Sequence, residues 1–344
     1  MSQSITGPLP PLPNTTQNLR VPPGGSSFRV SALGGGHGLK ATLSALRIIA
    51  AEHLTAVCTV ADDGGSSGRL RHDMDVIPPG DLRMALTALC DDTDWGRTWS
   101  DVMQHRFRSK DGVSGSLDNH AMGNLLIVAL WELLGDPVDG LRWAGALLGA
   151  RGQVLPMSRT PLTMSGLLQP DGSDAETVRI SSQAELAHAG MLGRLSDVQI
   201  HPAEAEACTE AVTAIELSDW VVLGPGSWYT SVLPHLLLHD MRTALYETEA
   251  RRCLVMNLTS DTAETQGMTP AGHLDVLGHY APGLHIDAII ADPHSVLEDE
   301  QEDFAAAAER LGAQIMYAKV RSQDRPDIHD PLRLAIAFNE VFHG

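Results

Sequence analysis

The chain has 344 residues, of which 43% are hydrophobic and 19% are charged. That apolar share can bury a full core, so global disorder is excluded, and the length predicts two domains or one large α/β domain with an insertion. The formal net charge of −19 would repel phosphate backbones and anionic lipids, which argues against a nucleic-acid-binding or membrane-surface protein.

Cysteine usage and hydropathy predict a cytoplasmic protein. The cysteines Cys58, Cys90, Cys208 and Cys253 are far apart and form no CxxC pair. This spacing argues against a disulfide framework or a zinc knuckle, and reduced thiols fit a cytosolic protein. Cys58 and Cys253 lie inside apolar runs and are expected to be buried. No stretch reaches the roughly 18 apolar residues of a membrane-spanning helix, and the N-terminus lacks the pattern of a secretory signal.

The N-terminal half predicts a flexible tail followed by a Rossmann-like unit. Residues 1–27 are rich in proline, glycine and small polar residues, which is typical of a disordered tail. Within residues 28–150, apolar strands at 28–33 and 54–60 are each followed by a glycine-rich turn. Leucines at helical spacing follow the first turn, and a second helix is expected over 124–134. This alternation predicts a doubly wound parallel α/β sheet.

The second half predicts a β-rich insertion and then a return to alternating strands and helices. Short strands are expected at 154–155, 162–168 and 177–181, with a hairpin turn at 169–172, so residues 151–200 form the insertion. Residues 201–344 are expected to complete the sheet, with a helix over 204–217 and buried strands at 220–223, 252–258 and 285–291.

Three strands therefore end in turns rich in glycine, at 34–38, 64–68 and 224–227. Glycine lets backbone approach a phosphate, and ligands of open α/β sheets bind at the carboxyl ends of the strands, so we expect a nucleotide-type ligand. The turns contain neither the GxGxxG motif of dinucleotide-dependent dehydrogenases nor the GKS/T of P-loop ATPases, so the sequence gives no support to hydride transfer or ATP hydrolysis. His37 either donates to a phosphate or caps the turn. The candidate ligand-binding residues in these turns are Gly34, Gly35, Gly36, His37, Gly38, Gly65, Ser66, Ser67, Gly224, Gly226 and Ser227.

Two adjacent acids, Asp62 and Asp63, open the second turn. They could bind a ribose, hold Mg²⁺ against a diphosphate, or simply form an Asx turn. Magnesium is the one cofactor that they suggest, and the sequence identifies no catalytic residue. Ser66 and Ser67 could donate to a phosphate, with Arg69 or Arg71 supplying positive charge.

Three further residues are candidates outside the glycines. Asp81 precedes a helical run and could be its N-cap. Arg83, at the start of the same helix, opposes the helix dipole, so it contacts either a phosphate or a surface acid. Tyr229, after the third turn, could stack on a base or sugar or pack in the core.

The motifs GGGHGL, TVADDGGSSGRLR, PPGDLR, NHAMGN, GQVLP and GPGSWYTSVLP resemble those of the YvcK-like gluconeogenesis factors, which belong to the superfamily of 2-phospho-L-lactate transferase (CofD). The resemblance runs from Phe28 to the C-terminus. It implies a Rossmann-like fold that binds a UDP-sugar, notably UDP-N-acetylglucosamine. It also implies a cytoplasmic role in cell shape and envelope synthesis during gluconeogenic growth, without established catalysis.

The same resemblance places the three turns around the nucleotide and makes Tyr229 a uridine contact. Asn124, in NHAMGN, joins the candidate ligand-binding residues. Relatives often carry an arginine before a C-terminal histidine, where this chain has Ile328, so Arg325 or Arg333 would have to replace it. A Ser/Thr kinase is an expected partner of such a protein, and we expect a homo-oligomer.

The competing class is the transferase itself, which moves a phospholactyl group from a nucleotide diphosphate to a deazaflavin alcohol with Mg²⁺. That branch shares the glycine turn and the acid pair, but a PDLDT-like motif follows. This chain has GGSSGRLR and PPGDLR instead, which favours the binding protein.

Overall fold

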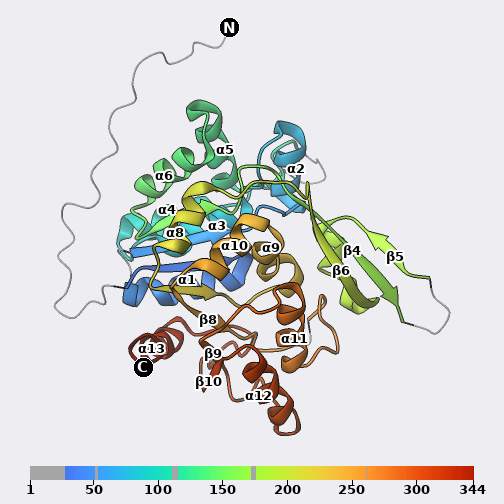
Figure 1. Cartoon of the computed structure of the whole chain (residues 1–344). Helices are drawn as coiled ribbons and strands as arrows, with labels where there is room; N and C mark the ends of the chain where they lie inside the picture. The colour runs from blue at the N-terminus through green and yellow to red at the C-terminus, as the bar shows by residue number, and fades with distance from the viewer. Residues whose placement is uncertain (1–27, 51–52, 111–114, 172–175, 261) are drawn as a thin grey trace.

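The computed structural model describes residues 28–50, 53–110, 115–171, 176–260 and 262–344. Within these ranges a seven-stranded sheet forms the centre of the molecule (Figure 1), in the order β10-β9-β8-β7-β1-β2-β3 with every neighbouring pair parallel. Its strands are β1 (Val30–Gly34), β2 (Leu54–Cys58), β3 (Gln153–Pro156), β7 (Trp220–Leu223), β8 (Arg251–Val255), β9 (Ala288–Ala291) and β10 (Gln314–Tyr317). The predicted doubly wound α/β sheet is confirmed.

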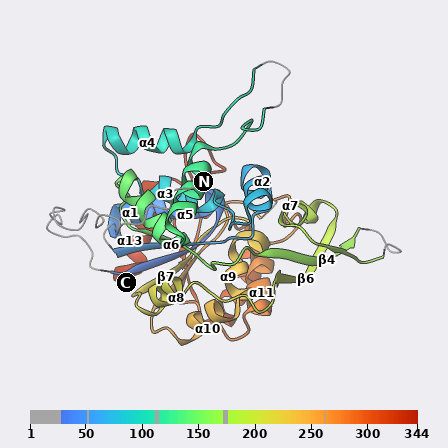
Figure 2. The same ribbon diagram turned by 90° about the horizontal axis from the view of Figure 1, so that it is seen from above.

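Helices cover both faces of this sheet, as Figure 2 shows. On one face α1 (Gly36–Ala50) packs between α3 (Gly80–Leu89) and α13 (Pro331–His343). On the other lie α8 (Thr209–Glu216), α10 (His239–Glu247) and α11 (Pro270–Tyr280). All residues of β1, β7 and β9 are buried, as expected for parallel strands covered on both faces. The remaining helices are α2 (Gly65–Met74), α4 (Asp94–Gln104), α5 (Met122–Leu134), α6 (Pro137–Leu148), α7 (Gln183–Leu186), α9 (Pro234–Leu237), α12 (Gln301–Arg310), a π-helix at Trp228–Val232 and short 3₁₀ helices at Ala189–Met191 and Glu298–Glu300.

The strand order reverses between β1 and β7. From β1 the chain adds β2 and β3 on one side, then returns to place β7 to β10 on the other, so that Val30 pairs with both Leu54 and Trp220. In open α/β sheets the ligand crevice lies at the carboxyl ends of the strands at such a switch point. Here the turns after β1 and β7 are the first and third glycine turns.

A small antiparallel sheet in the order β5-β4-β6 projects from the side of the main body (Figures 1 and 2). It consists of β4 (Thr163–Pro170), β5 (Val178–Ile180) and β6 (Gly193–His201). The strand expected at 154–155 was wrongly placed in this insertion, since β3 pairs with β2 at the edge of the main sheet. The helix expected from 204 begins only at Thr209. The tail at 1–27 and part of the hairpin turn at 169–172 lie outside the described residues.

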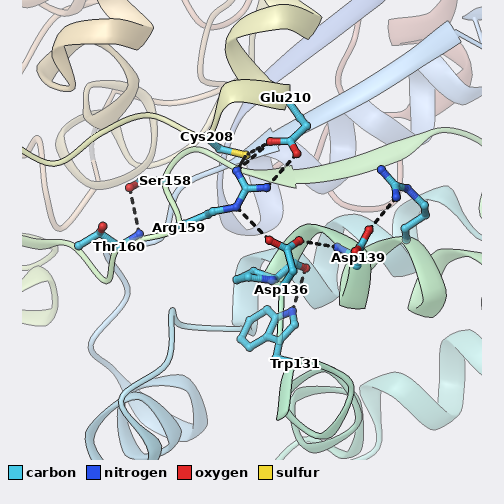
Figure 3. A network of polar contacts seen from close by, with 10 residues as sticks. Trp131, Asp136, Asp139, Ser158, Arg159, Thr160, Cys208 and Glu210 are labelled. Carbon is cyan, nitrogen blue, oxygen red and sulfur yellow. Dashed lines mark hydrogen bonds and ion pairs between the residues drawn. The ribbon is translucent and has the colours of Figure 1, made fainter. Parts of the chain in front are cut away.

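An ion-pair network joins the segment after β3 to two helices that flank the main sheet (Figure 3). Arg159, just after β3, donates to both carboxylate oxygens of Glu210 at 2.8 Å and to Asp136 Oδ2 at 3.2 Å. Asp136 also caps α6, because its side chain accepts from the N–H of Asp139. The Arg159 hydrogen bonds lower the pKa of Glu210 to about 2. Arg159 therefore ties β3 to the N-termini of α6 and α8.

All four cysteines are free, and the burial predicted for Cys58 and Cys253 is found for Cys90 and Cys208 as well. No helix in the described part of the chain has the length and apolar character needed to cross a membrane.

Candidate functional site

The first and third glycine turns touch at the switch point. A Cβ on Gly38 would lie 1.7 Å from the carbonyl oxygen of Pro225, so only glycine allows this approach. Gly226, with φ of +135°, faces Gly38 from the third turn. The first turn is shorter than expected, because α1 already begins at Gly36. His37 and Ser227 are exposed at the surface of this junction.

Asn257, which sequence reasoning did not single out, fixes the third turn. Its Oδ1 accepts from the N–H of Gly226 at 2.7 Å, and its Nδ2 donates to the Gly226 carbonyl at 2.9 Å. Asn257 follows β8, the strand beside β7. A polar residue directly after an apolar run was the signal that could have indicated it.

Asp81 joins the first turn to the second half of the site. A Cβ on Gly35 would lie 2.4 Å from Asp81 Oδ2 and 2.6 Å from Thr59 Cγ2, so these residues pack directly on the first turn. The Asp81 carboxylate accepts from the N–H of Gly36, which starts α1. Asp81 is not the N-cap that the sequence suggested: Pro79 holds that position, and Asp81 lies in the first turn of α3.

The two adjacent acids of the second turn serve different partners. Asp62 accepts from the N–H of Gly64 at 2.9 Å and from the Ser67 hydroxyl, so it closes an Asx turn while facing Asp81. Asp63 accepts from the N–H groups of Gln183 and Ala184 at 2.8 and 3.0 Å, at the N-terminus of α7. The Asx turn that the sequence allowed is thus formed by Asp62, while Asp63 is turned toward α7. Asp62 shares a cavity with Asp81, and binding of a ribose or of Mg²⁺ by the acids stays a prediction.

That cavity, of about 300 Å³, lies between α2 and α3. It is lined by Asp62, Gly64, Gly65, Ser66, Ser67, Gly80, Asp81, Arg83, Met84, Arg106, Asn119 and Asn124. Several sequence candidates thus meet at one place. Residues 106 and 119, which sequence reasoning missed, come from the segment between α4 and α5, far along the chain from the second turn.

Arg83 is buried, with 4% of its surface exposed, so the surface ion pair considered from the sequence is wrong. Its Nε donates to Asn124 Oδ1 at 2.8 Å, and its Nη1 donates to Gln104. Burial and the neighbouring Arg106 lower the pKa of Arg83 to about 10. No carboxylate within the described ranges forms a direct ion pair with Arg83. The carboxylate that interacts with its charge is Asp81, which lines the same cavity.

Tyr229 and its neighbours form the π-helix after the third turn. The Tyr229 ring is only 4% exposed and belongs to the hydrophobic core, so its first role is packing. Glu264 accepts from the N–H of Thr230 at 2.9 Å, and burial raises the pKa of Glu264 to about 7. Single-turn π-helices are frequent at functional sites. Contact of Tyr229 with a base stays a prediction.

Neither suggested replacement for the C-terminal arginine is free. Arg325 pairs with Asp327 at 3.0 Å, and Arg333 donates to the carbonyl of Arg321 at 3.1 Å. Ile328 itself is 37% exposed.

We expect Asp81→Asn to change how stability depends on pH. Burial and the nearby Asp62 raise the pKa of Asp81 to about 7 in the folded protein, from about 3.9 in an unfolded chain. The folded state thus binds an extra proton between these values. This preference for the protonated Asp81 stabilises the folded state fully below about pH 4, and the stabilisation is lost as the pH rises to about 7. Asparagine cannot ionise, so the variant should gain stability relative to the wild type from pH 5 to pH 8 in urea unfolding. Glu264, whose pKa is also about 7, is present in both proteins, so its contribution cancels in the difference between them. If the unfolding free energies of variant and wild type ran parallel over this pH range, the pKa assigned to Asp81 would be contradicted.

The doubly wound parallel sheet, with its glycine turns meeting at the switch point, places this protein in the class of Rossmann-like α/β proteins. The family model described as 2-phospho-L-lactate transferase CofD matches residues 30–324, and the chain belongs to this family.

Relatives and solved structures agree with this assignment. A Mycobacterium tuberculosis protein, provisionally named a gluconeogenesis factor, is 45% identical over 91% of this chain and 90% of its own length. A Halalkalibacterium halodurans protein named a gluconeogenesis factor is 35% identical over 76% of each chain. The crystal structure of a UPF0052 family member from Bacillus halodurans superposes with a TM-score of 0.77 at 29% identity, covering 92% of this chain and all of that one.

Proposed function

We propose that this protein is a cytoplasmic factor that binds a nucleotide sugar of the UDP-N-acetylglucosamine type, without catalysis, in support of cell shape and envelope synthesis during gluconeogenic growth. The observation that carries the proposal is the contact between the two glycine turns at the switch point, where Gly38 meets Pro225. The names of the relatives from Mycobacterium and Halalkalibacterium support the gluconeogenic part.

The site offers groups suited to each part of such a ligand. A diphosphate would approach the N-terminus of α1, where the helix dipole and the N–H groups after Gly36 favour negative charge, the Gly36 N–H itself being bound to Asp81. Arg83 and Arg106 would balance the charge of the ligand from the cavity beside it. Asp62, on the turn after β2, would be the acid that accepts from a ribose hydroxyl.

The second candidate is the transferase activity for which the family model is named. The observation that favours it is that Asp62 and Asp81 line one cavity, because Mg²⁺ at phosphate sites typically uses one or two carboxylates. These two residues would hold the ion, which would neutralise charge on a diphosphate. Against it, Asp63, the second acid of the motif, caps α7.

The two candidates make opposite predictions for turnover. Purified protein should bind UDP-N-acetylglucosamine in calorimetric titration and should transfer no phospholactyl group to a deazaflavin alcohol in the presence of Mg²⁺. Efficient transfer, detected by mass spectrometry of the deazaflavin product, would replace the binding protein with the transferase. Phosphorylation by a Ser/Thr kinase and homo-oligomer formation stay predictions.

A further inference from the structure

A buried polar network surrounds Ser66, at the start of α2. Ser66 is 3% exposed and lines the cavity between α2 and α3. Its Oγ lies 3.1 Å from His120 Nδ1, 3.1 Å from Asn124 Nδ2 and 3.3 Å from the backbone nitrogen of Ala121. His120 is itself buried, at 6% exposure, and lies outside the cavity lining.

Arg69 determines the tautomer of His120. Its Nε–H points at His120 Nε2 at 3.1 Å. An arginine can only donate, so Nε2 must be the bare, accepting nitrogen. A ring with a bare nitrogen is neutral, and burial and the Arg69 charge favour this form by lowering the pKa of His120. Its single proton is then on Nδ1, which donates to Ser66.

Arg83 fixes the orientation of Asn124 in the same way. The Arg83 Nε–H meets one atom of the Asn124 amide at 2.8 Å, and that atom must be the oxygen. The NH₂ group of Asn124 therefore faces Ser66. His120 and Asn124, each at 3.1 Å, thus donate to the two lone pairs of the Ser66 oxygen, and the Ala121 N–H at 3.3 Å is a weaker third contact. None of these three groups can accept a hydrogen bond, so the Ser66 hydroxyl proton has no partner among them and is available to the cavity that Ser66 lines.

The neighbouring serine differs, although it stands beside Ser66 in the same turn. Ser67 donates to the carboxylate of Asp62, so its proton is engaged. The charged groups lining the cavity are Asp62, Asp81, Arg83 and Arg106. Both carboxylates accept backbone N–H bonds, from Gly64 and Gly36 respectively. Arg106 donates to the carbonyl of Asn119, and Arg83 to two side-chain amides.

We propose that the Ser66 hydroxyl and the Arg83 guanidinium together receive a phosphate oxygen of the ligand, and that His120, held by Arg69, is the positioning residue that turns Ser66 into a donor. This inference rests on the proposed nucleotide-sugar function and names the groups that bind its diphosphate. His120 acts through Ser66 and does not touch the ligand. Ser67 contributes no hydrogen bond to it.

Inorganic pyrophosphate is the probe, titrated calorimetrically into the full chain at pH 7.5 without divalent cations. Ser66→Ala should weaken its binding by about tenfold or more, the loss expected for one hydrogen bond to a charged group. Ser44→Ala is the matched control, because the Ser44 hydroxyl donates to the Lys40 carbonyl within α1 and Ser44 does not line the cavity. That variant should bind pyrophosphate as the wild type does. Circular dichroism checks that both variants are folded.

A second measurement does not depend on any variant. Nitrogen-15 NMR of the wild-type histidines should show His120 with its proton on Nδ1 and a bare Nε2 at pH 7. A proton on Nε2, or equal pyrophosphate affinity in Ser66→Ala and wild type, would overturn the inference. If Ser66→Ala leaves UDP-N-acetylglucosamine binding intact, this inference fails while the proposed function stands. If pyrophosphate binds through Ser66 but UDP-N-acetylglucosamine does not bind, the proposed function fails and the anion site stands.

Discussion

Gly38→Ala should abolish UDP-N-acetylglucosamine binding and destabilise the fold. The new Cβ would lie 1.7 Å from the Pro225 carbonyl oxygen and 2.5 Å from its carbon, both backbone atoms that cannot rotate away. The turns after β1 and β7 would have to separate. Overpacking in a tight core typically costs 1–3 kcal/mol, and an overlap with backbone on this scale should cost about 3 kcal/mol or more. Urea unfolding and calorimetric titration measure the two effects.

The matched control is Gly278→Ala. Gly278 lies inside α11, and its nearest contact would be Leu311 Cδ2 at 3.8 Å, which is ordinary van der Waals distance. Alanine should stabilise that helix by about 0.5–1 kcal/mol and leave ligand binding unchanged. Binding that survives Gly38→Ala at wild-type affinity would show that the ligand does not use the junction of the two turns.

Arg83→Met should weaken UDP-N-acetylglucosamine binding by at least about 30-fold. The guanidinium is 4% exposed and forms no direct ion pair among the described residues, so a bound diphosphate would be the counter-charge in direct contact with it, in addition to the more distant Asp81. Removing one member of a buried charge pair typically costs about 2–5 kcal/mol. Methionine keeps most of the side-chain volume, and it removes an unpaired buried charge, so the fold should persist.

Arg97→Met serves as the control for loss of positive charge. Arg97 lies on α4, is exposed, and pairs with Asp94 at 2.7 Å. Surface ion pairs of this kind contribute about 0–1 kcal/mol, so stability and affinity should both stay close to wild type. Equal affinities for the two methionine variants would remove Arg83 from the site.

The sheet and the glycine turns could be predicted because their signals are local. Runs such as residues 220–223 are apolar throughout, and a following glycine turn marks the strand end. Pairing partners are not local: β3 is four residues long, and nothing in it tells whether it joins β2 or the insertion. The sequence therefore predicted the fold class correctly and the edge of the insertion wrongly.

Side-chain partners were the harder part of the site for the same reason. From the sequence, Asp63 and Asp62 were expected to have the same role. In the structure both carboxylate oxygens of Asp63 accept hydrogen bonds from the N-terminus of α7, about 120 residues later in the chain. His120 and Asn257 each act on a turn that is distant in sequence, at Ser66 and Gly226. Spacing can indicate which residue types gather at a strand end, but the donor or acceptor that each one meets depends on tertiary packing.

The most direct test of the central claim is calorimetric titration of the purified full chain with UDP-N-acetylglucosamine, GDP and NAD, each with and without Mg²⁺. We predict saturable binding of UDP-N-acetylglucosamine at one site per chain, tighter than that of GDP or NAD. Absence of UDP-N-acetylglucosamine binding under both conditions, or tighter binding of GDP than of the UDP-sugar, would contradict the account.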